Sequence, residues 1–109
     1  MALAVEASGS QVCTVTTTHT LSTPATNKTR CILVDLGTAV SGDTFRIDIL
    51  VKVLTGGTSA IAYSATYSNA QGEPIIISPP IPIFWGGVFK LTQTAGTSRT
   101  IPWELLTLD

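Results

Sequence analysis

The stretch DTFRIDILVKVL, residues 43–54, decides the fold class of this chain. Apolar side chains recur at every second position and alternate mainly with polar or charged ones. A period of two is that of a β-strand, so one face of the stretch is predicted to lie in a core and the other in water. The predicted inward residues are Phe45, Ile47, Ile49, Val51 and Val53, and the predicted outward residues are Thr44, Arg46, Asp48, Leu50 and Lys52.

The rest of the chain carries the same kind of signal. Thr, Val and Ile dominate, and these β-branched residues suit a pleated strand better than a helix. Further strands are predicted over residues 11–18, 31–36, 59–67, 74–78, 87–94 and 100–108, separated by turns that contain glycine. In the strand at 59–67, we expect Ile61, Tyr63, Ala65 and Tyr67 to share one face. Short strands at spacings of about ten residues predict an all-β fold, a small antiparallel β-sandwich or β-barrel.

The length of 109 residues matches one domain, so residues 1–109 are predicted to form a single β domain. Residues 1–9 are expected to form an extended N-terminal arm that adds a strand to a neighbouring subunit through main-chain hydrogen bonds, with disorder as the alternative. Residues 20–29 are expected to be a loop that packs little against the domain. A single turn of helix is the most that the pattern permits at residues 103–106.

Composition limits the partners of this domain. Charged residues make up 12% of the chain, about half the share in an average soluble domain, so a partner is expected to cover part of the exterior. The formal net charge is -1 and the basic residues are scattered, which argues against a nucleic-acid partner. No apolar run approaches the roughly 20 residues of a membrane span, and the start lacks the pattern of a secretory signal. We therefore expect synthesis and folding in a cytoplasm, where the sequon at Asn27 is accidental.

Residues that carry catalysis or bind metals are scattered along the chain. His19 is the only histidine and is flanked by threonines, so it is interpreted as a surface or loop residue instead of a catalytic base. The carboxylates fall singly, which makes a glycosidase pair the weaker interpretation. Cys13 and Cys31 are expected to be buried free thiols, with one disulfide as the alternative. The sequence thus predicts no enzyme, no cofactor, no metal site and no small-molecule substrate.

The segment PIIISPPIPIFWGG, residues 74–87, is the most informative one for binding. Its prolines at positions 79, 80 and 82 remove backbone donors, so it is not predicted to be a central strand. One interpretation is a segment that crosses between sheets and caps the core. The other is an exposed apolar rim that docks on a partner. In that case the partner-binding residues are Ile81, Ile83, Phe84 and Trp85, with Leu3 and Val5 of the arm as a second contact.

Several segments together resemble a group of short proteins encoded among the virion structural genes of tailed bacteriophages. They are VKVLTGGT at 51–58, Ala62-Tyr63, Glu73-Pro74, SPP at 78–80, LTQTAGT at 91–97 and Pro102-Trp103, in this order, with EASGS at 6–10 and THTL at 18–21 as looser matches. Residues 83–88 depart from the pattern, where a more polar connection is expected. The resemblance implies a capsid cement or decoration protein, a homo-trimer that binds the major capsid protein on the capsid surface of the virion and stabilises the head. It also implies synthesis in the cytoplasm of a bacterial host.

Two other functions remain open at this point. A tail or baseplate component of the same particle is the first alternative, and the sequence does not separate it well from the cement function. A carbohydrate- or host-binding module is the third possibility, because Tyr63, Tyr67, Trp85 and Trp103 are candidate stacking platforms for sugar rings. A membrane partner is not expected in any of the three cases.

Overall fold

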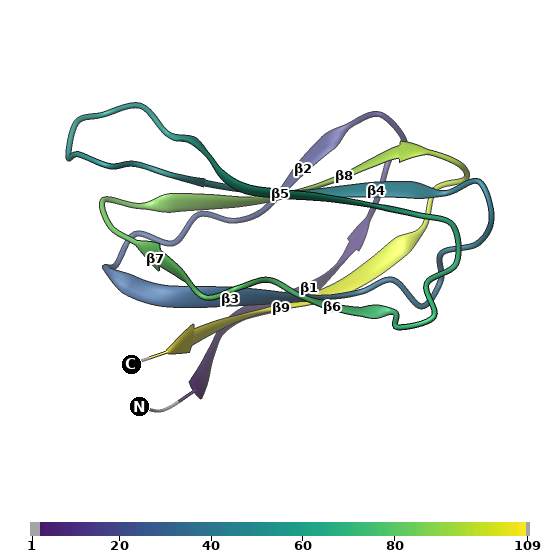
Figure 1. Ribbon diagram of the computed structural model, residues 1–109, viewed down its shortest axis with the longest axis horizontal. Helices are drawn as coiled ribbons and strands as arrows, with labels where there is room; N and C mark the ends of the chain where they lie inside the picture. The colour runs from purple at the N-terminus through teal and green to yellow at the C-terminus, as the bar shows by residue number, and fades with distance from the viewer. Residues whose placement is uncertain (1–2, 109) are drawn as a thin grey trace.

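The alternating stretch forms strand β4, which lies inside one sheet of a β-sandwich (Figure 1). The computed structural model describes residues 3–108, and these fold into nine strands and no helix. Two antiparallel sheets pack face to face, so the prediction of an all-β fold is confirmed and the architecture is the sandwich. The strands are β1 (Leu3–Val12), β2 (Thr18–Ser22), β3 (Lys28–Asp35), β4 (Thr44–Val51), β5 (Ala60–Ser68), β6 (Ile75–Ile77), β7 (Ile81–Ile83), β8 (Gly87–Ala95) and β9 (Thr100–Leu108).

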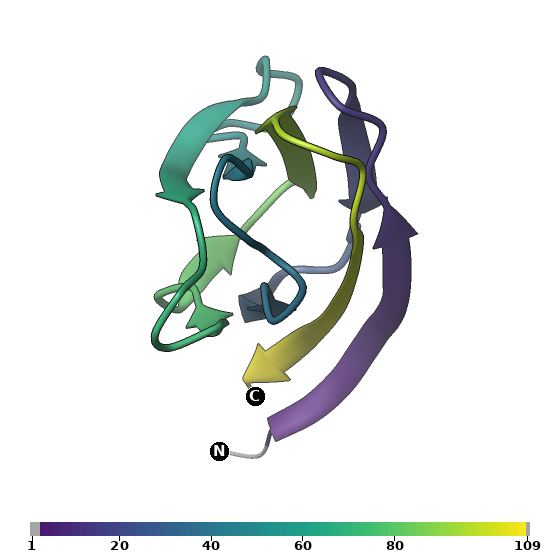
Figure 2. The same ribbon diagram turned by 90° about the vertical axis from the view of Figure 1, so that its right-hand side faces the viewer.

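Strands distant in sequence are neighbours in both sheets. The five-stranded sheet has the order β1-β9-β3-β6, and β7 pairs with β3 as well; the four-stranded sheet has the order β2-β8-β4-β5. The first and last strands therefore lie side by side, with Leu3 opposite Leu108 (Figure 1). Figure 2 looks along the sandwich from one end and shows the chain crossing repeatedly between the two layers.

The core lies between the sheets and is built from alternate residues of the central strands. Each such aliphatic or aromatic side chain contributes roughly 1.5–3 kcal/mol when it leaves water. The members that are at most 2% exposed include Phe45, Ile47, Ile49, Phe89 and Leu91 from the four-stranded sheet and Ile32, Val34, Ile101 and Leu105 from the five-stranded sheet. Val53 was predicted to point inward, but β4 ends at Val51 and Val53 is exposed.

The N-terminal segment is a strand of its own domain. Where an arm was expected over residues 1–9, residues from Leu3 onward belong to β1, which pairs with β9 along its whole length. Met1 and Ala2 lie outside the described residues. The backbone of this segment thus finds its hydrogen-bond partners within the chain, although none of the described strands lies on the other side of β1.

The strand prediction did not include two local features, a turn at Thr16 and a bulge at Ala62. Residues 11–18 do not form one strand, because β1 ends at Val12 and the chain turns through Thr16, whose φ of 69° is unusual for a β-branched residue. In β5, Ile49 faces Tyr63 and Leu50 faces Ile61, so a bulge at Ala62 turns Ile61 away from the core. The shared face predicted for Ile61, Tyr63, Ala65 and Tyr67 therefore holds only for the last three.

A second bulge places a charge inside the sandwich. The register of β1 against β9 shifts between Val5 and Ala7, which leaves Glu6 as the extra residue of the bulge. Its carboxylate reaches the guanidinium of Arg30, a residue that is fully buried. Arg30 Nε donates to Glu6 Oε1 at 2.6 Å, and Arg30 Nη1 and Nη2 donate to the backbone oxygen and the hydroxyl of Thr26, both at 2.7 Å. The pair ties β1 and the loop before β3 to the inside of the five-stranded sheet.

Removing one member of this pair is expected to leave an unbalanced buried charge. Glu6→Ala should lower the free energy of unfolding by about 3 kcal/mol, measured by urea denaturation. The double variant Glu6→Leu with Arg30→Met is the control, since well-packed apolar residues often replace a buried ion pair without loss. A single variant as stable as the native chain would contradict this account.

Asp43 organises the opposite end of the sandwich, where three loops meet. Its carboxylate accepts hydrogen bonds from Val40 N at 3.1 Å, Thr97 N at 3.2 Å and Arg99 Nε at 2.7 Å. Burial alone would raise the pKa of Asp43, but these hydrogen bonds outweigh it and the pKa is lowered. Gly96 leaves the space that the carboxylate needs, since a Cβ there would overlap Asp43.

The lowered pKa of Asp43 predicts how stability depends on pH. The folded-state pKa lies below the unfolded value of about 3.9, so the stabilisation is complete above that value and is lost as pH falls through the folded-state pKa. Asp43→Asn should therefore be less stable than the native chain at pH 7, and the difference should shrink below about pH 4. Glu73→Gln, on an exposed loop, is the control. A difference between Asp43→Asn and the native chain that does not change with pH would contradict the prediction.

Candidate interaction surface

The outer face of the four-stranded sheet is largely polar. Strand pairing aligns two of its rows, Thr18-Thr92-Arg46-Thr66 and Thr20-Lys90-Asp48-Ser64. Asp48, expected in water, is only 8% exposed because Arg46 Nε and Ser64 Oγ both donate to its Oδ1, at 2.9 and 2.8 Å. Polar side chains on this face of the sheet thus hydrogen-bond one another. The next row along, Ile61-Leu50-Val88, is apolar.

The outer face of the five-stranded sheet is built differently. Pairing aligns the rows Leu3-Leu108-Thr29-Pro82, Val5-Leu106-Cys31 and Ser8-Glu104-Leu33-Ile77, and Ile75 stands opposite Asp35. Leu3 is 67% exposed, Val5 58%, Ile75 50% and Ile77 63%. We call the seven residues Leu3, Val5, Leu33, Ile75, Ile77, Leu106 and Leu108 the apolar face. A soluble sandwich normally keeps the outer side of its sheets polar, so this face is suited to contact with another macromolecule.

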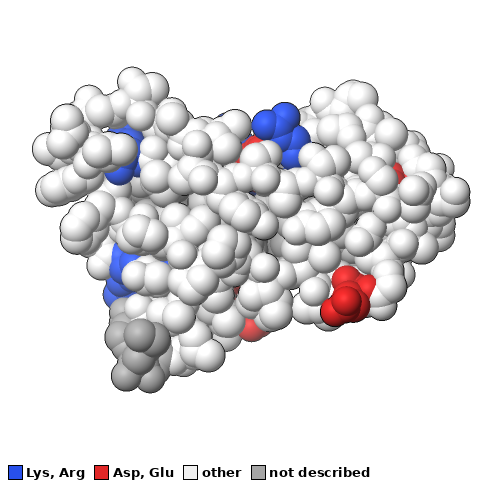
Figure 3. All heavy atoms as spheres, in the orientation of Figure 1, with Lys and Arg blue, Asp and Glu red and all other residues white. Residues whose placement is uncertain are grey.

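Acidic groups border the apolar face at one corner. A shallow hollow of about 270 Å³ is lined by Leu33, Ile75 and Pro102, together with the carboxylates of Asp35 and Glu104. Asp35 Oδ1 accepts a hydrogen bond from the Gly37 N–H at 2.8 Å. Elsewhere charged side chains are dispersed, and the side of the molecule seen in Figure 3 is mostly uncharged.

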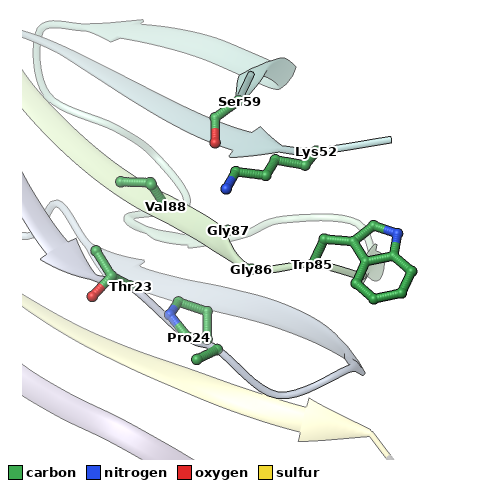
Figure 4. A pocket seen from close by; sticks show the side chains of 9 residues that line it. Thr23, Pro24, Lys52, Ser59, Trp85, Gly86, Gly87 and Val88 are labelled. Atoms are coloured by element: carbon green, nitrogen blue, oxygen red, sulfur yellow. The ribbon is translucent and has the colours of Figure 1, made fainter. Parts of the chain in front are cut away.

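Three loops at one end of the sandwich carry a second group of exposed apolar side chains. They span residues 23–27, 52–59 and 84–86, and their most exposed members are Val53, Leu54, Phe84 and Trp85. The loops enclose an open hollow of about 280 Å³ whose lining contains no carboxylate. In Figure 4 the Lys52 side chain extends toward Ser59 and Gly87, whereas the Trp85 indole points away from them.

Trp85 adopts a backbone conformation that side chains rarely take. Its φ is 64°, and its N–H donates to Asn27 Oδ1 at 3.2 Å. Gly86 follows with a φ of 90°, and Gly87 N donates to the backbone oxygen of Pro24 at 3.1 Å. A left-handed conformation costs a non-glycine residue of order 1–2 kcal/mol, which the surrounding contacts must supply. The indole is thereby held at the surface, 45% exposed.

The structure divides the predicted rim into two parts. Ile81 and Ile83 are 8% and 0% exposed and belong to the core, because β7 pairs with β3 and turns both side chains inward. They therefore follow the core-capping interpretation and are not accessible to a partner. Phe84 and Trp85 are exposed, as the docking interpretation requires, and so are Leu3 and Val5.

The sequence analysis predicted only Leu3 and Val5 of the apolar face as partner-binding residues. Leu33, Ile75, Ile77 and Leu106 each sit next to an inward apolar residue in an unbroken apolar run. A strand with apolar residues at consecutive positions has two apolar faces, so the absence of alternation was the signal. It differs from the alternating signal of residues 43–54.

The candidate catalytic residues do not come together. His19 Nε2 accepts a hydrogen bond from Thr14 N at 3.0 Å, which fixes the loop before β2. Cys13 and Cys31 are buried free thiols, as predicted, and burial raises the pKa of both. Within residues 3–108 no three His, Cys, Asp or Glu side chains lie close enough to hold a metal ion.

Comparison with family models, curated proteins and solved structures found no match for the chain. Among the described residues no helix has the length and apolarity to cross a bilayer. An interaction surface is therefore indicated by two features of the structure, the apolar face and the three loops at residues 23–27, 52–59 and 84–86.

The division of the rim predicts opposite results at two adjacent positions. Ile83→Ala should lower the free energy of unfolding by about 3 kcal/mol, because it opens a cavity in a close-packed core. Phe84→Ala removes a side chain that is 58% exposed and should change stability by less than about 1 kcal/mol. Chemical denaturation of the two variants measures both values. Equal losses would show that Phe84 also belongs to the core.

Proposed function

We propose that this chain is a non-enzymatic virion structural protein, a capsid cement or decoration protein that binds the major capsid protein lattice and stabilises the head. The observation that carries the proposal is the apolar face, set on the opposite side of the sandwich from the polar rows. Such a surface supports binding by area and shape, with no need for a reactive group.

The energetics favour a partner that offers many equivalent sites. Burying an exposed Leu or Ile yields roughly 1.5–3 kcal/mol, whereas association costs an estimated 4–15 kcal/mol in lost freedom. A face with four strongly exposed aliphatic residues therefore binds one site modestly. On a lattice, each bound copy still favours the assembled state by mass action, because it has no site on dissociated subunits. Repetition over the lattice then adds these modest contributions together.

The resemblance to short virion proteins of tailed phages supplies the identity of the partner in this proposal. It also supplies the homo-trimer, the location on the capsid surface and synthesis in the host cytoplasm. A tail or baseplate role would use the same apolar face on a different lattice, so the position of the chain in intact particles separates the two.

One observation favours a carbohydrate-binding role as a second candidate. Trp85 presents an exposed indole at the margin of the hollow that Lys52 and Ser59 line, although the ring points away from these two side chains. Tyr63 and Tyr67, in contrast, pack against the core, and so does Trp103. One aromatic ring is a small platform for a sugar, so this role predicts Trp85-dependent binding on a glycan array.

The cement function predicts that charges on the apolar face abolish attachment. The double variant Leu3→Asp with Ile77→Asp should bind purified phage shells at least tenfold more weakly in co-sedimentation, because each loss of about 1.4 kcal/mol costs tenfold in affinity. Both side chains are more than half exposed, so the fold should remain stable.

The control carries its new charge on the polar face instead. Thr20→Asp, on an exposed β2 position opposite Lys90, should leave attachment unchanged. Shells carrying the native protein should also resist heat and osmotic shock better than stripped shells. Equal resistance of the two, or undiminished attachment of the double variant, would reject the proposal.

A further inference from the structure

The two open sheets end in strands that differ in how well they are protected from pairing with another chain. An exposed sheet edge presents a row of unpaired N–H and C=O groups, and proteins block such edges with charges, prolines, bulges or short strands. β1 contains a bulge and the inward-pointing Glu6. β2 has five residues and a bulge, and β6 and β7 have three residues each, with Pro82 in β7.

β5 lacks most of these devices. It has nine residues, Ala60–Ser68, with no charge and no proline, and among the described strands it pairs only with β4. The bulge at Ala62 leaves residues 63–68 in regular register, from Tyr63 opposite Ile49 to Ser68 opposite Thr44. In Figure 2, where β5 lies at one margin of its layer, no strand within residues 3–108 covers its outer side. Alternate backbone groups of this stretch therefore point outward without a partner strand.

We propose that β5 pairs antiparallel with β5 of a second copy of this chain, about a two-fold axis that passes through Ala65. The pairing joins the two four-stranded sheets into one continuous sheet. It uses the edge of one sheet, whereas the proposed lattice contact uses the outer face of the other, so this inference does not rest on the proposed lattice contact. The two-fold dimer is an alternative to the homo-trimer that the resemblance implies, and the oligomeric state of the native chain decides between them.

The register follows from matching the side chains. An axis at Ala65 places Tyr63 opposite Tyr67 of the second copy on the inner side, and Ser64 opposite Thr66 of the second copy on the outer side. Aromatic pairs and hydroxyl pairs that face each other across antiparallel strands both stabilise a sheet. An axis one residue away, at Ser64 or Thr66, instead sets a tyrosine opposite an alanine. Ala65, the smallest of these side chains, lies on the axis, opposite Ala65 of the second copy.

Order and charge around β5 also favour a second copy. Tyr63 and Tyr67 already pack on the core, and burial, together with a hydrogen bond that the Tyr67 hydroxyl donates to Tyr63, raises the pKa of Tyr67. These rings are therefore ordered before association and lose little freedom in it. The nearest charges, Arg46 and Asp48 on β4, are paired with each other and leave no net charge to repel the same pair in a second copy.

The first experiment places charges across the proposed axis. Ser64→Lys with Thr66→Lys sets like charges opposite each other only in the dimer, and Ser64→Lys with Thr66→Glu is the matched control with opposite charges. Sedimentation equilibrium of the native chain should show a dimer whose dissociation constant rises at least tenfold in the first variant and not in the second. A native monomer at all concentrations, a native trimer, or equal behaviour of the two variants would overturn the inference.

The second experiment does not depend on those variants folding well. Ala65→Cys should form a disulfide-linked dimer under mild oxidation, because directly opposed residues of antiparallel strands lie within disulfide reach. Ala60→Cys, exposed in the same strand but away from the axis, should not, and the native chain with its two buried thiols is the blank. Cross-linking at position 60 equal to that at position 65, or none at either, would overturn the register. Shell attachment of Leu3→Asp with Ile77→Asp is measured separately, so failure of either proposal is recognised by itself.

Discussion

The rest of this structure depends on one constraint, the burial of the apolar inner faces of the two sheets against each other. Phe45, Ile47 and Ile49 on one side and Ile32 and Leu105 on the other are almost completely removed from water. Because side chains alternate along a strand, a shift of one residue in any pairing would expel such a set from the core. The register of each central strand is thereby fixed, and the outer faces carry whatever residues remain.

The remaining residues make the two sides of the molecule unequal. The four-stranded sheet uses hydroxyl groups and the Arg46–Asp48 pair on much of its outer face, whereas the five-stranded sheet places Leu3, Val5 and Ile77 outward. A core of this size does not need those side chains, and their exposure lowers the solubility of a free monomer. These are the side chains that the proposed partner would cover.

Hydrophobic periodicity predicted those strands in which inward and outward side chains alternate without a bulge. Residues 43–54 show it plainly, and β4 follows the expected pattern up to Val51. Bulges at Glu6 and Ala62 were not predictable, because an inserted residue changes the facing of its neighbours without changing composition. The predicted apolar rim at residues 81–85 was correct only in part, for a similar reason. Proline positions identified the segment around Phe84 and Trp85, but only the pairing of β7 with β3 decides that Ile83 points inward.

The position of β9 has a consequence for how the chain acquires its structure during synthesis. β9 lies between β1 and β3 and hydrogen-bonds to both, yet it leaves the ribosome after the other eight strands. Until it arrives, β1 has no strand to pair with in its sheet and β3 lacks its neighbour on that side. Contacts between segments so distant in sequence form slowly, so the nascent chain exposes both edges for most of its production. Nascent chains on neighbouring ribosomes are thus most prone to mispair before residues 100–108 have emerged.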